Sequence, residues 1–198
     1  MIPRNLTATV AILCSLTLGM SLYLWQLRRR EIGSGPRETV PQHVTAPVLG
    51  QTEKISLIVA HDDTGQILPQ SLSIAVSNNQ QQQAEEILRQ LLDVYQRKDS
   101  PHPLTGSAEI RDVYLVQPGI AVVDVNSAFA DGQTSGILAE ELTVVSFIQT
   151  LSVNLPNLTG VKILVDGKER ETLAGHVDIS GVYSTAEVSQ LAKQMGPQ

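Results

Sequence analysis

Cysteine is almost absent from this chain of 198 residues, which holds a single one, Cys14. Because Cys14 lies in an apolar N-terminal stretch, the rest of the chain can form no internal disulfide and offers no cysteine nucleophile. Aromatic residues are also scarce, at 4%, which leaves few rings on which nucleic-acid bases could stack. The folded part must therefore be held together by an aliphatic core.

The signatures of common active sites are missing as well. The chain contains no P-loop, no G-x-G-x-x-G motif, no G-x-S-x-G motif and no H-E-x-x-H motif. Its histidines do not follow the spacing of zinc ligands; they are His43, His61, His102 and His176. From these absences we expect no catalytic residue, no cofactor and no metal site, and we predict that the protein is not an enzyme.

Acidic and basic residues are distributed unevenly. Residues 1–37 carry five arginines and one glutamate, whereas residues 54–184 carry 8 basic and 16 acidic side chains. The acidic excess argues against nucleic acid as a partner, because phosphate binding requires clustered lysine and arginine. The basic N-terminal segment instead suits the anionic headgroups of a membrane.

An uncharged stretch of 22 residues spans positions 6–27. As a helix it would reach about 33 Å, enough to cross the hydrocarbon core of a bilayer. No small-residue cleavage site follows it, so we predict an uncleaved transmembrane anchor over residues 1–30; a cleaved secretory signal is the alternative. Residues 31–53 are rich in glycine, proline and polar side chains and are expected to form a flexible linker.

Residues 54–184 predict one α/β (α+β) domain. Short apolar runs rich in β-branched residues predict strands, at residues 54–60, 72–76, 112–116, 120–125 and 161–165. Two longer stretches have helical spacing. The first follows the N-cap candidates Ser77 to Asn79, and the second, residues 136–155, is apolar on more than one face. We expect two main helices packed on a mixed sheet, and a short helix or tail over residues 185–198.

Turn signals lie between these elements. The cluster from Asp62 to Gly65, followed by Pro69, predicts a loop. Gln117-Pro118-Gly119 separates two strands and predicts a β-hairpin. Asp166-Gly167 predicts a type I′ turn, after which residues 168–173 would return as a polar edge strand.

Acidic side chains next to these turns are the candidate site residues: Asp62, Asp63, Asp124 and Asp166. His61-Asp62-Asp63 is the only tight cluster of a histidine with carboxylates, so it could bind a metal, although a solvated turn is the simpler interpretation. Asp124 ends a strand, where an acid more often bonds backbone amides than takes part in catalysis.

Three further polar residues lie on the second helix: Glu140, Glu141 and Gln149. They could line a pocket, but we expect them to form a narrow solvated stripe. Asn157-Leu158-Thr159 matches a glycosylation sequon, a pattern short enough to occur by chance.

Three segments together resemble the GerMN domain of sporulation and spore-germination proteins. They are the hairpin VYLVQPGIAVVDVNSAF, the helix GILAEELTVVSFIQTL, which ends in the Thr150-Leu151 step, and the strand and turn NLPNLTGVKILVDG. The likeness covers residues 54–183 and is strongest over 111–175. It implies an α/β module at the bacterial cell surface that acts as an envelope or scaffold module, with no catalytic residues to carry over. Sporulation members of the family often have two tandem copies and a lipid anchor, whereas this chain has one copy and an apolar anchor.

Two arguments place the domain on opposite sides of the membrane. The positive-inside rule would keep Arg28, Arg29 and Arg30 in the cytoplasm, together with the domain that follows them. The resemblance implies an exported domain, and a lone N-terminal segment usually inserts with its C-terminal side translocated. We therefore expect a single-pass protein of the inner (cytoplasmic) membrane whose domain is extracytoplasmic.

Two classes of function follow. The first is a membrane-tethered, non-catalytic interaction or scaffold module of the GerMN type, which binds another envelope protein or itself and is linked to sporulation or germination in spore-formers. The alternative is a domain that binds or hydrolyses cell-wall material with Asp62, Asp63 and Asp124 gathered in one cleft, since a glycosidase needs two carboxylates at a defined separation. A concave acidic pocket would favour the alternative.

Overall fold

A computed structural model describes residues 51–134 and 136–196, and its elements confirm the mixed α and β fold class. The strands are β1 (Thr52–His61), β2 (Gln66–Ala75), β3 (Ile110–Val116), β4 (Ile120–Val125), β5 (Gly160–Val165) and β6 (Val182–Ser184). The helices are α2 (Gln80–Tyr95), α3 (Ser127–Asp131), α4 (Ile137–Asn154) and α5 (Thr185–Gln194).

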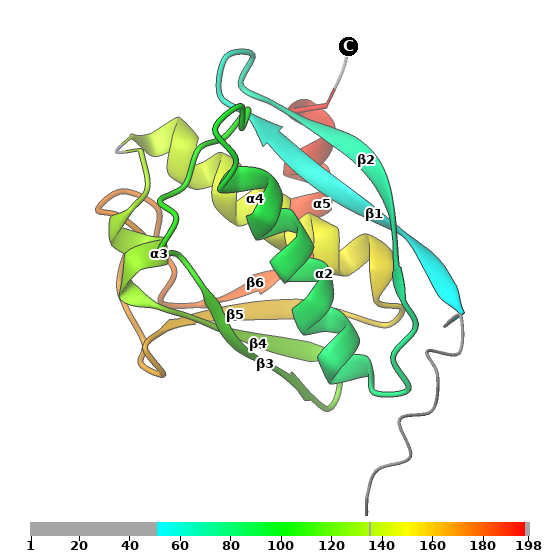
Figure 1. Ribbon diagram of the computed structural model, residues 1–198. Coiled ribbons are helices and arrows are strands. Elements are labelled where there is room, and N and C mark those ends of the chain that lie inside the picture. The colour runs from blue at the N-terminus through cyan, green and yellow to red at the C-terminus, as the bar shows by residue number, and fades with distance from the viewer. Residues whose placement is uncertain (1–50, 135, 197–198) are drawn as a thin grey trace, which may run out of the picture. The chain divides into compact units, whose positions relative to one another are not determined.

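The mixed sheet has four strands in the order β3-β4-β5-β6. β4 and β5 run parallel and the other two pairs are antiparallel. A parallel pair needs a crossover connection, which α3 and α4 supply here. β1 and β2 form a separate antiparallel pair. Figure 1 shows α2 and α4 above one face of the four-stranded sheet, with the β1–β2 pair across the helices from it.

The central position of α4 explains its apolar sequence. The helix packs against β1, α2 and α5, and its other side faces the sheet. Leu142, Ile148 and Leu151 are fully buried. A helix surrounded on all sides must be apolar nearly all round, and the core it organises is mainly aliphatic, as the composition predicts.

One face of α4 is nevertheless polar, and it binds the free edge of β1. Polar side chains recur there at three- and four-residue spacing: Thr143, Ser146, Thr150 and Asn154. The backbone N–H of Ile58 donates to Thr150 Oγ1 at 2.9 Å, and that of Ser56 donates to Asn154 Oδ1 at 3.0 Å. These side chains satisfy backbone donors that another strand would otherwise bind, so β1 needs no second strand neighbour.

Local sequence explains how several elements begin and end. Asn79, one of the three predicted N-caps, accepts the Gln81 N–H at 2.9 Å and starts α2. Asp166 and Gly167 have φ angles of 51° and 72°, which confirms that both central positions of the predicted turn are left-handed. The hairpin of β3 and β4 around residues 117–119 is also confirmed.

Two predictions about strands are wrong. Pro69, predicted in a loop, lies within β2 opposite Ile58; β2 is an edge strand, where a missing N–H is tolerated. Residues 168–173 do not form an edge strand, because only isolated bridges, Val165 to Lys168 and Thr172 to Asp178, occur there. The three-residue β6 occupies that edge of the sheet instead.

The structure describes the C-terminal end of the domain up to residue 196 but not the N-terminal residues 1–50. The predicted C-terminal helix is present as α5, which packs on α4 and buries Val188 and Ala192. The predicted anchor and most of the predicted linker lie outside the described residues. Within residues 51–134 and 136–196, none of the helices combines the length and the apolar character needed to cross a bilayer.

Candidate functional site

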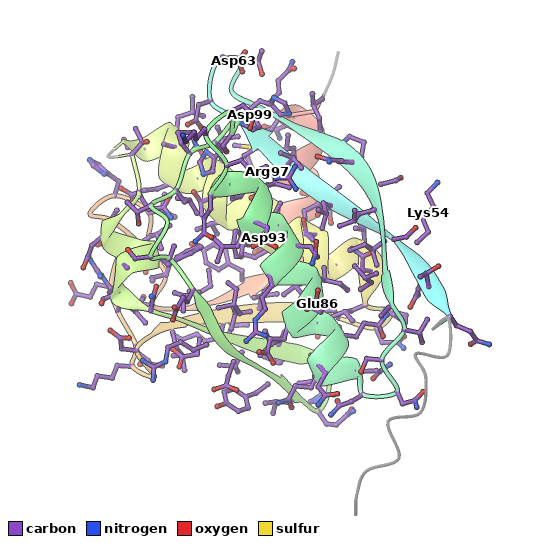
Figure 2. All side chains as sticks on the ribbon, in the orientation of Figure 1. Lys54, Asp63, Glu86, Asp93, Arg97 and Asp99 are labelled. Carbon is purple, nitrogen blue, oxygen red and sulfur yellow. The ribbon has the colours of Figure 1, made fainter. Side chains whose placement is uncertain are left out.

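The acidic candidates do not gather in one place. Asp62 and Asp63 lie at the tip of the β1–β2 pair, whereas Asp124 lies in β4 and Asp166 in the turn after β5, well apart from that tip in Figure 1. Figure 2 shows Asp63 pointing outward from the tip. Among the described residues, no three His, Cys, Asp or Glu side chains are grouped so that they could hold a metal ion. The geometry therefore gives the metal interpretation of residues 61–63 no support.

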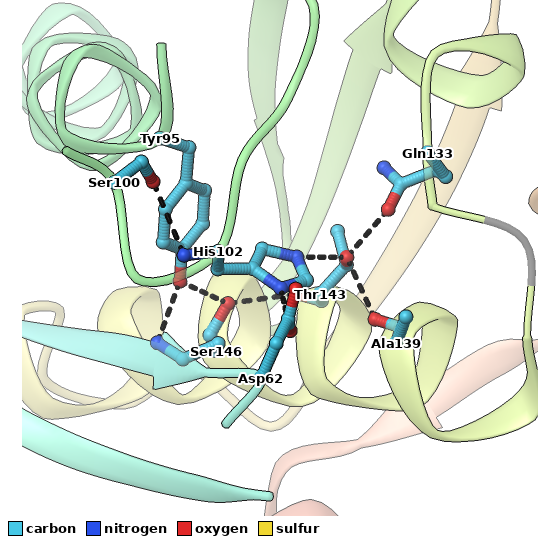
Figure 3. A network of polar contacts seen from close by, with 9 residues as sticks. Asp62, Tyr95, Ser100, His102, Gln133, Ala139, Thr143 and Ser146 are labelled. Atoms are coloured by element: carbon cyan, nitrogen blue, oxygen red, sulfur yellow. Dashed lines mark hydrogen bonds and ion pairs between the residues drawn. The ribbon is translucent and has the colours of Figure 1, made fainter. Parts of the chain in front are cut away.

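Asp62 instead belongs to a buried network centred on His102 (Figure 3). The His102 ring is 2% exposed, and its Nδ1 lies 2.5 Å from Asp62 Oδ1. Its Nε2 lies 2.6 Å from Thr143 Oγ1 on α4. The backbone strengthens the link, since the Asp62 N–H donates to Pro101 O at 3.0 Å. Asp62 thus lies in the predicted turn and its side chain is 30% exposed, but its carboxylate also binds His102, whereas Asp63 is simply exposed.

Further hydrogen bonds hold the partners of His102 in place. Gln133 Nε2 donates to Phe129 O at 3.1 Å, and the Thr143 hydroxyl has two acceptors besides the imidazole, Gln133 Oε1 at 2.6 Å and Ala139 O at 3.0 Å. Asp62 and Thr143 thus contact the two ring nitrogens of His102 from opposite sides and fix the orientation of the ring.

An Asp–His–hydroxyl chain has the order of a hydrolase triad, but two features exclude that role here. Thr143 is 1% exposed, so no substrate reaches its oxygen. The hydroxyl also has acceptors in Gln133 and Ala139, whereas a triad nucleophile must give its proton to the histidine. The adjoining Tyr95 is equally enclosed: its hydroxyl accepts the Ala60 N–H and donates to Ser146, each at 2.9 Å. Burial raises the pKa of Tyr95 above its usual range.

Glu140 holds a loop in place from within the core. The predicted solvated stripe is wrong for this residue, which is 0% exposed. One carboxylate oxygen accepts the backbone N–H groups of Ala174, His176 and Val177 at 2.9–3.0 Å, and the other lies 2.7 Å from His176 Nδ1. Burial by itself raises the pKa of Glu140, but these hydrogen bonds outweigh it and hold the pKa at about 2. The neighbouring Glu141 and Gln149 are half-buried.

Asp124 binds the turn that follows the adjacent strand. Its Oδ1 accepts the Gly167 N–H at 2.7 Å, which confirms the backbone-binding role predicted for it. Arg111 bridges to this turn, with Nη1 2.8 Å from Asp166 Oδ1 and Nε 3.5 Å from Asp124 Oδ2. Asp124 of the hairpin and Asp166 of the β5 turn, both in segments that resemble the GerMN pattern, therefore connect the ends of β4 and β5.

The outer face of the four-stranded sheet, opposite the helices, is not covered by any other element within residues 51–134 and 136–196. Five apolar side chains gather there and are called the apolar sheet patch: Tyr114, Val116, Ile120, Val122 and Val182. Tyr114, Val116 and Val182 are exposed by 44%, 49% and 57%. Ile120 and Val182 meet over Gly160, where an added Cβ would lie 2.8 Å from one and 2.9 Å from the other.

Lys162 lies on the same face of the sheet, but its charge does not interrupt the apolar sheet patch. Lys162 lies between Val122 and Val182 in the strand register but is only 8% exposed. Its ammonium group contacts Ser180 O and lies 3.2 Å from Glu169. The charge is thus directed away from the patch, and the lysine stem adds to the apolar surface.

Sequence patterns missed the most buried members of these networks. His102 stands between two prolines, which indicates a loop and gives no sign of burial. Glu140 lies at a helix start, where an exposed acid is expected. The apolar sheet patch did leave a signal, because residues 114–116 and 120–123 are apolar on both faces of their strands.

Comparison with known proteins identifies the family. The model of the Germane family, described as sporulation and spore germination, matches residues 58–171, more than half of the chain. No curated protein matches the sequence. Two solved structures share the fold. The first GerMN domain of the sporulation protein GerM from Bacillus subtilis is 20% identical, with a TM-score of 0.51, over 67% of this chain and 98% of that one.

The other structure contains the tandem GerMN domains of the same Bacillus subtilis protein, with 19% identity and a TM-score of 0.52 over 69% of this chain and 48% of that one. This chain thus spans about half of the tandem structure. The resemblance in the hairpin, the central helix and the β5 turn is confirmed, and the chain belongs to the Germane family of sporulation and spore-germination domains.

Proposed function

We propose that this protein is a non-catalytic interaction module of the cell envelope, which docks another protein on its apolar sheet patch. The observation that carries the proposal is a set of exposed apolar side chains, Tyr114 and Val116 on β3 and Val182 on β6, which Ile120 and Val122 connect across the sheet. None of the described helices covers this face. Contiguous exposed apolar side chains are typical of surfaces that bind proteins.

The use of the polar residues supports a non-catalytic role. The carboxylates of Asp62, Asp124 and Glu140 each bind a buried side chain or backbone N–H groups of the domain itself. Over the described residues, every buried side-chain nitrogen and oxygen has a partner. Groups committed in this way stabilise the fold and are not poised for chemistry on a substrate.

In this proposal residues 6–27 anchor the protein in the cytoplasmic membrane and the domain acts outside it. The uncharged length of that segment supports the anchor. Reporter fusions after Gln198 address the topology: activity of a reporter that requires export is expected, and activity of a cytoplasm-only reporter would place the domain inside, as Arg28 to Arg30 suggest.

The acidic residues named for the alternative, a cell-wall hydrolase, do not gather in one cleft. A glycosidase needs two carboxylates facing one substrate. Asp62 and Asp63 lie at the β1–β2 tip, whereas Asp124 is 6% exposed and bound to Gly167 at the sheet.

A paired experiment tests the proposal. Val182→Lys, in the apolar sheet patch, should abolish cellular function while the protein stays folded, and Val153→Lys, at a valine exposed by 47% on α4, should not. Asp63→Asn and Asp124→Asn should leave function nearly intact. Cell-wall hydrolysis by the purified protein that disappears in either Asn variant, with an unchanged melting temperature, would show that the domain is an enzyme.

A further inference from the structure

An open hollow of about 370 Å³ lies beside the β3–β4 turn. Three segments enclose it: the first residue of α2, the β3–β4 turn with its strand ends, and the loop of residues 155–159. Its volume lies within the range of small-molecule sites. The QPG and NLPNLT segments that belong to the family resemblance form most of its wall, and the docking function proposed above gives them no role.

Hydrogen bonds join the segments that form the wall of the hollow. The backbone N–H groups of Thr159 and Gly160 both donate to Gly119 O, at 2.7 Å and 3.2 Å. Gly119 has a φ of +82°, and a Cβ there would lie 2.4 Å from Asn157 O, so a side chain is excluded. On the far side, Thr185 Oγ1 donates to Leu158 O at 2.9 Å. These contacts fix the turn and the loop against each other.

The lining of the hollow combines neutral amides with an aliphatic floor. Gln80, Gln117 and Asn157 come from the three separate segments, and their exposed carboxamides make no hydrogen bond to another described residue. The aliphatic part of the lining consists of Leu115, Val116, Ile120, Leu155 and Leu158, and Val116 and Ile120 also belong to the apolar sheet patch. No charged side chain takes part in the lining.

We infer that this hollow binds an N-acetylated hexosamine. A carboxamide offers both a donor and an acceptor, and so does the acetamido group of such a sugar. The aliphatic floor suits the acetyl methyl group and the C–H face of the ring. Polar groups contributed from three directions match hydroxyls that surround a sugar ring, whereas the amides of an extended peptide lie along one line.

Charge points to the same class of ligand. Residues 51–198 carry 9 basic and 18 acidic side chains, so an anionic ligand would be repelled. A cationic ligand would find no carboxylate in the lining to pair with. A neutral ligand that forms hydrogen bonds is the class that remains.

Saturation-transfer NMR on the full-length protein in a sugar-free detergent tests the inference. The probes are N-acetylglucosamine and its β-1,4-linked trimer, with glucose and Nα-acetylalanine amide for comparison. Gln117→Glu keeps the size and an acceptor of the side chain but removes its N–H donors. We expect transfer to the acetyl methyl group of both acetamido sugars and at least tenfold weaker binding by this variant. Gln190→Glu, on the exposed side of α5, is the matched control and should bind normally.

Three outcomes would contradict the inference. Absence of transfer to the acetamido sugars would show that the hollow is not a sugar site. Equal binding by Gln117→Glu and the unaltered protein would place the sugar elsewhere on the molecule. Equal transfer to glucose or to the peptide amide would reject the assigned ligand class. The docking proposal is judged separately, because the hollow shares Val116 and Ile120 with the apolar sheet patch but the altered residue, Gln117, is not part of the patch.

Discussion

The hydroxyl of Thr150 accepts the backbone N–H of Ile58 at 2.9 Å, across 92 positions of sequence. This bond joins the central helix to the free edge of β1, and Thr150 belongs to the Thr-Leu step by which the helix resembles the GerMN pattern. Thr150 therefore has a structural role, because its hydroxyl accepts a β1 N–H group that a neighbouring strand would otherwise bind.

Thr150→Val keeps the shape of the side chain and removes the acceptor. The buried Ile58 N–H then has no partner, and we expect a loss of about 1–3 kcal/mol in the free energy of unfolding. Hydrogen exchange at the Ile58 amide should become faster. Thr150→Ser keeps the hydroxyl, so exchange at Ile58 should stay slow even though a buried methyl is lost. Equal exchange in the two variants would show that the bond is unimportant.

Asp62 and Asp63 are adjacent in sequence but differ in environment, which gives a matched pair of variants. Asp62→Asn weakens the 2.5 Å contact of the carboxylate with buried His102, and we expect it to lower the free energy of unfolding by about 1–3 kcal/mol. Asp63→Asn, at the exposed tip, should change it by less than about 0.5 kcal/mol.

Urea unfolding measures both changes, and a His102→Phe background supplies the control. Without the imidazole, Asp62→Asn should have almost no further effect, because the two side chains act as a pair. An Asp62→Asn effect of the same size in both backgrounds would mean that Asp62 acts through another contact.

Glu140 predicts a specific dependence of stability on acid. Its pKa is lowered from 4.5 to about 2 in the folded protein, so its ionised form favours folding. That contribution, about 3 kcal/mol at 1.36 kcal/mol for each pKa unit, should be complete above pH 4.5 and should disappear as the pH falls towards 2. The difference in unfolding free energy between the unaltered protein and Glu140→Gln, measured in urea across this range, should shrink accordingly.

Glu141→Gln is the control for this experiment, because the neighbouring glutamate is half-buried and does not hold the 174–177 loop. Its difference from the unaltered protein should be small at every pH. A difference for Glu140→Gln that stays constant from pH 7 to pH 2 would contradict the account of the loop.

Local patterns predicted the two long helices, one N-cap and the tight turn after β5 well, because the determinants lie close together in sequence. The first half of the ten-residue β2 was not predicted, because the pattern around Pro69 is typical of a loop. The apolar spacing of α2, the Asn79 cap and the Asp166-Gly167 turn each depend on a few neighbouring residues. The five-residue α3 and the three-residue β6 are too short to leave a periodic pattern, and neither was predicted.

The environment of the candidate site residues depends on distant contacts. Glu140 is buried because a loop more than thirty positions later wraps around it. His102 is buried because the tip of β1–β2 and α4 meet it from two sides. Residue propensity and spacing do not predict contacts between segments that are distant in sequence. The polar networks could therefore be identified only from the folded structure.

The central claim is that the apolar sheet patch docks another protein, and site-specific photo-crosslinking in native membranes tests it most directly. A photoreactive residue at position 182 should give one discrete crosslinked species, which disappears when Tyr114→Ser is added. The same residue at position 153, on α4, should give none. A crosslinking pattern that is the same at both positions, or that the Tyr114→Ser change leaves intact, would contradict the account.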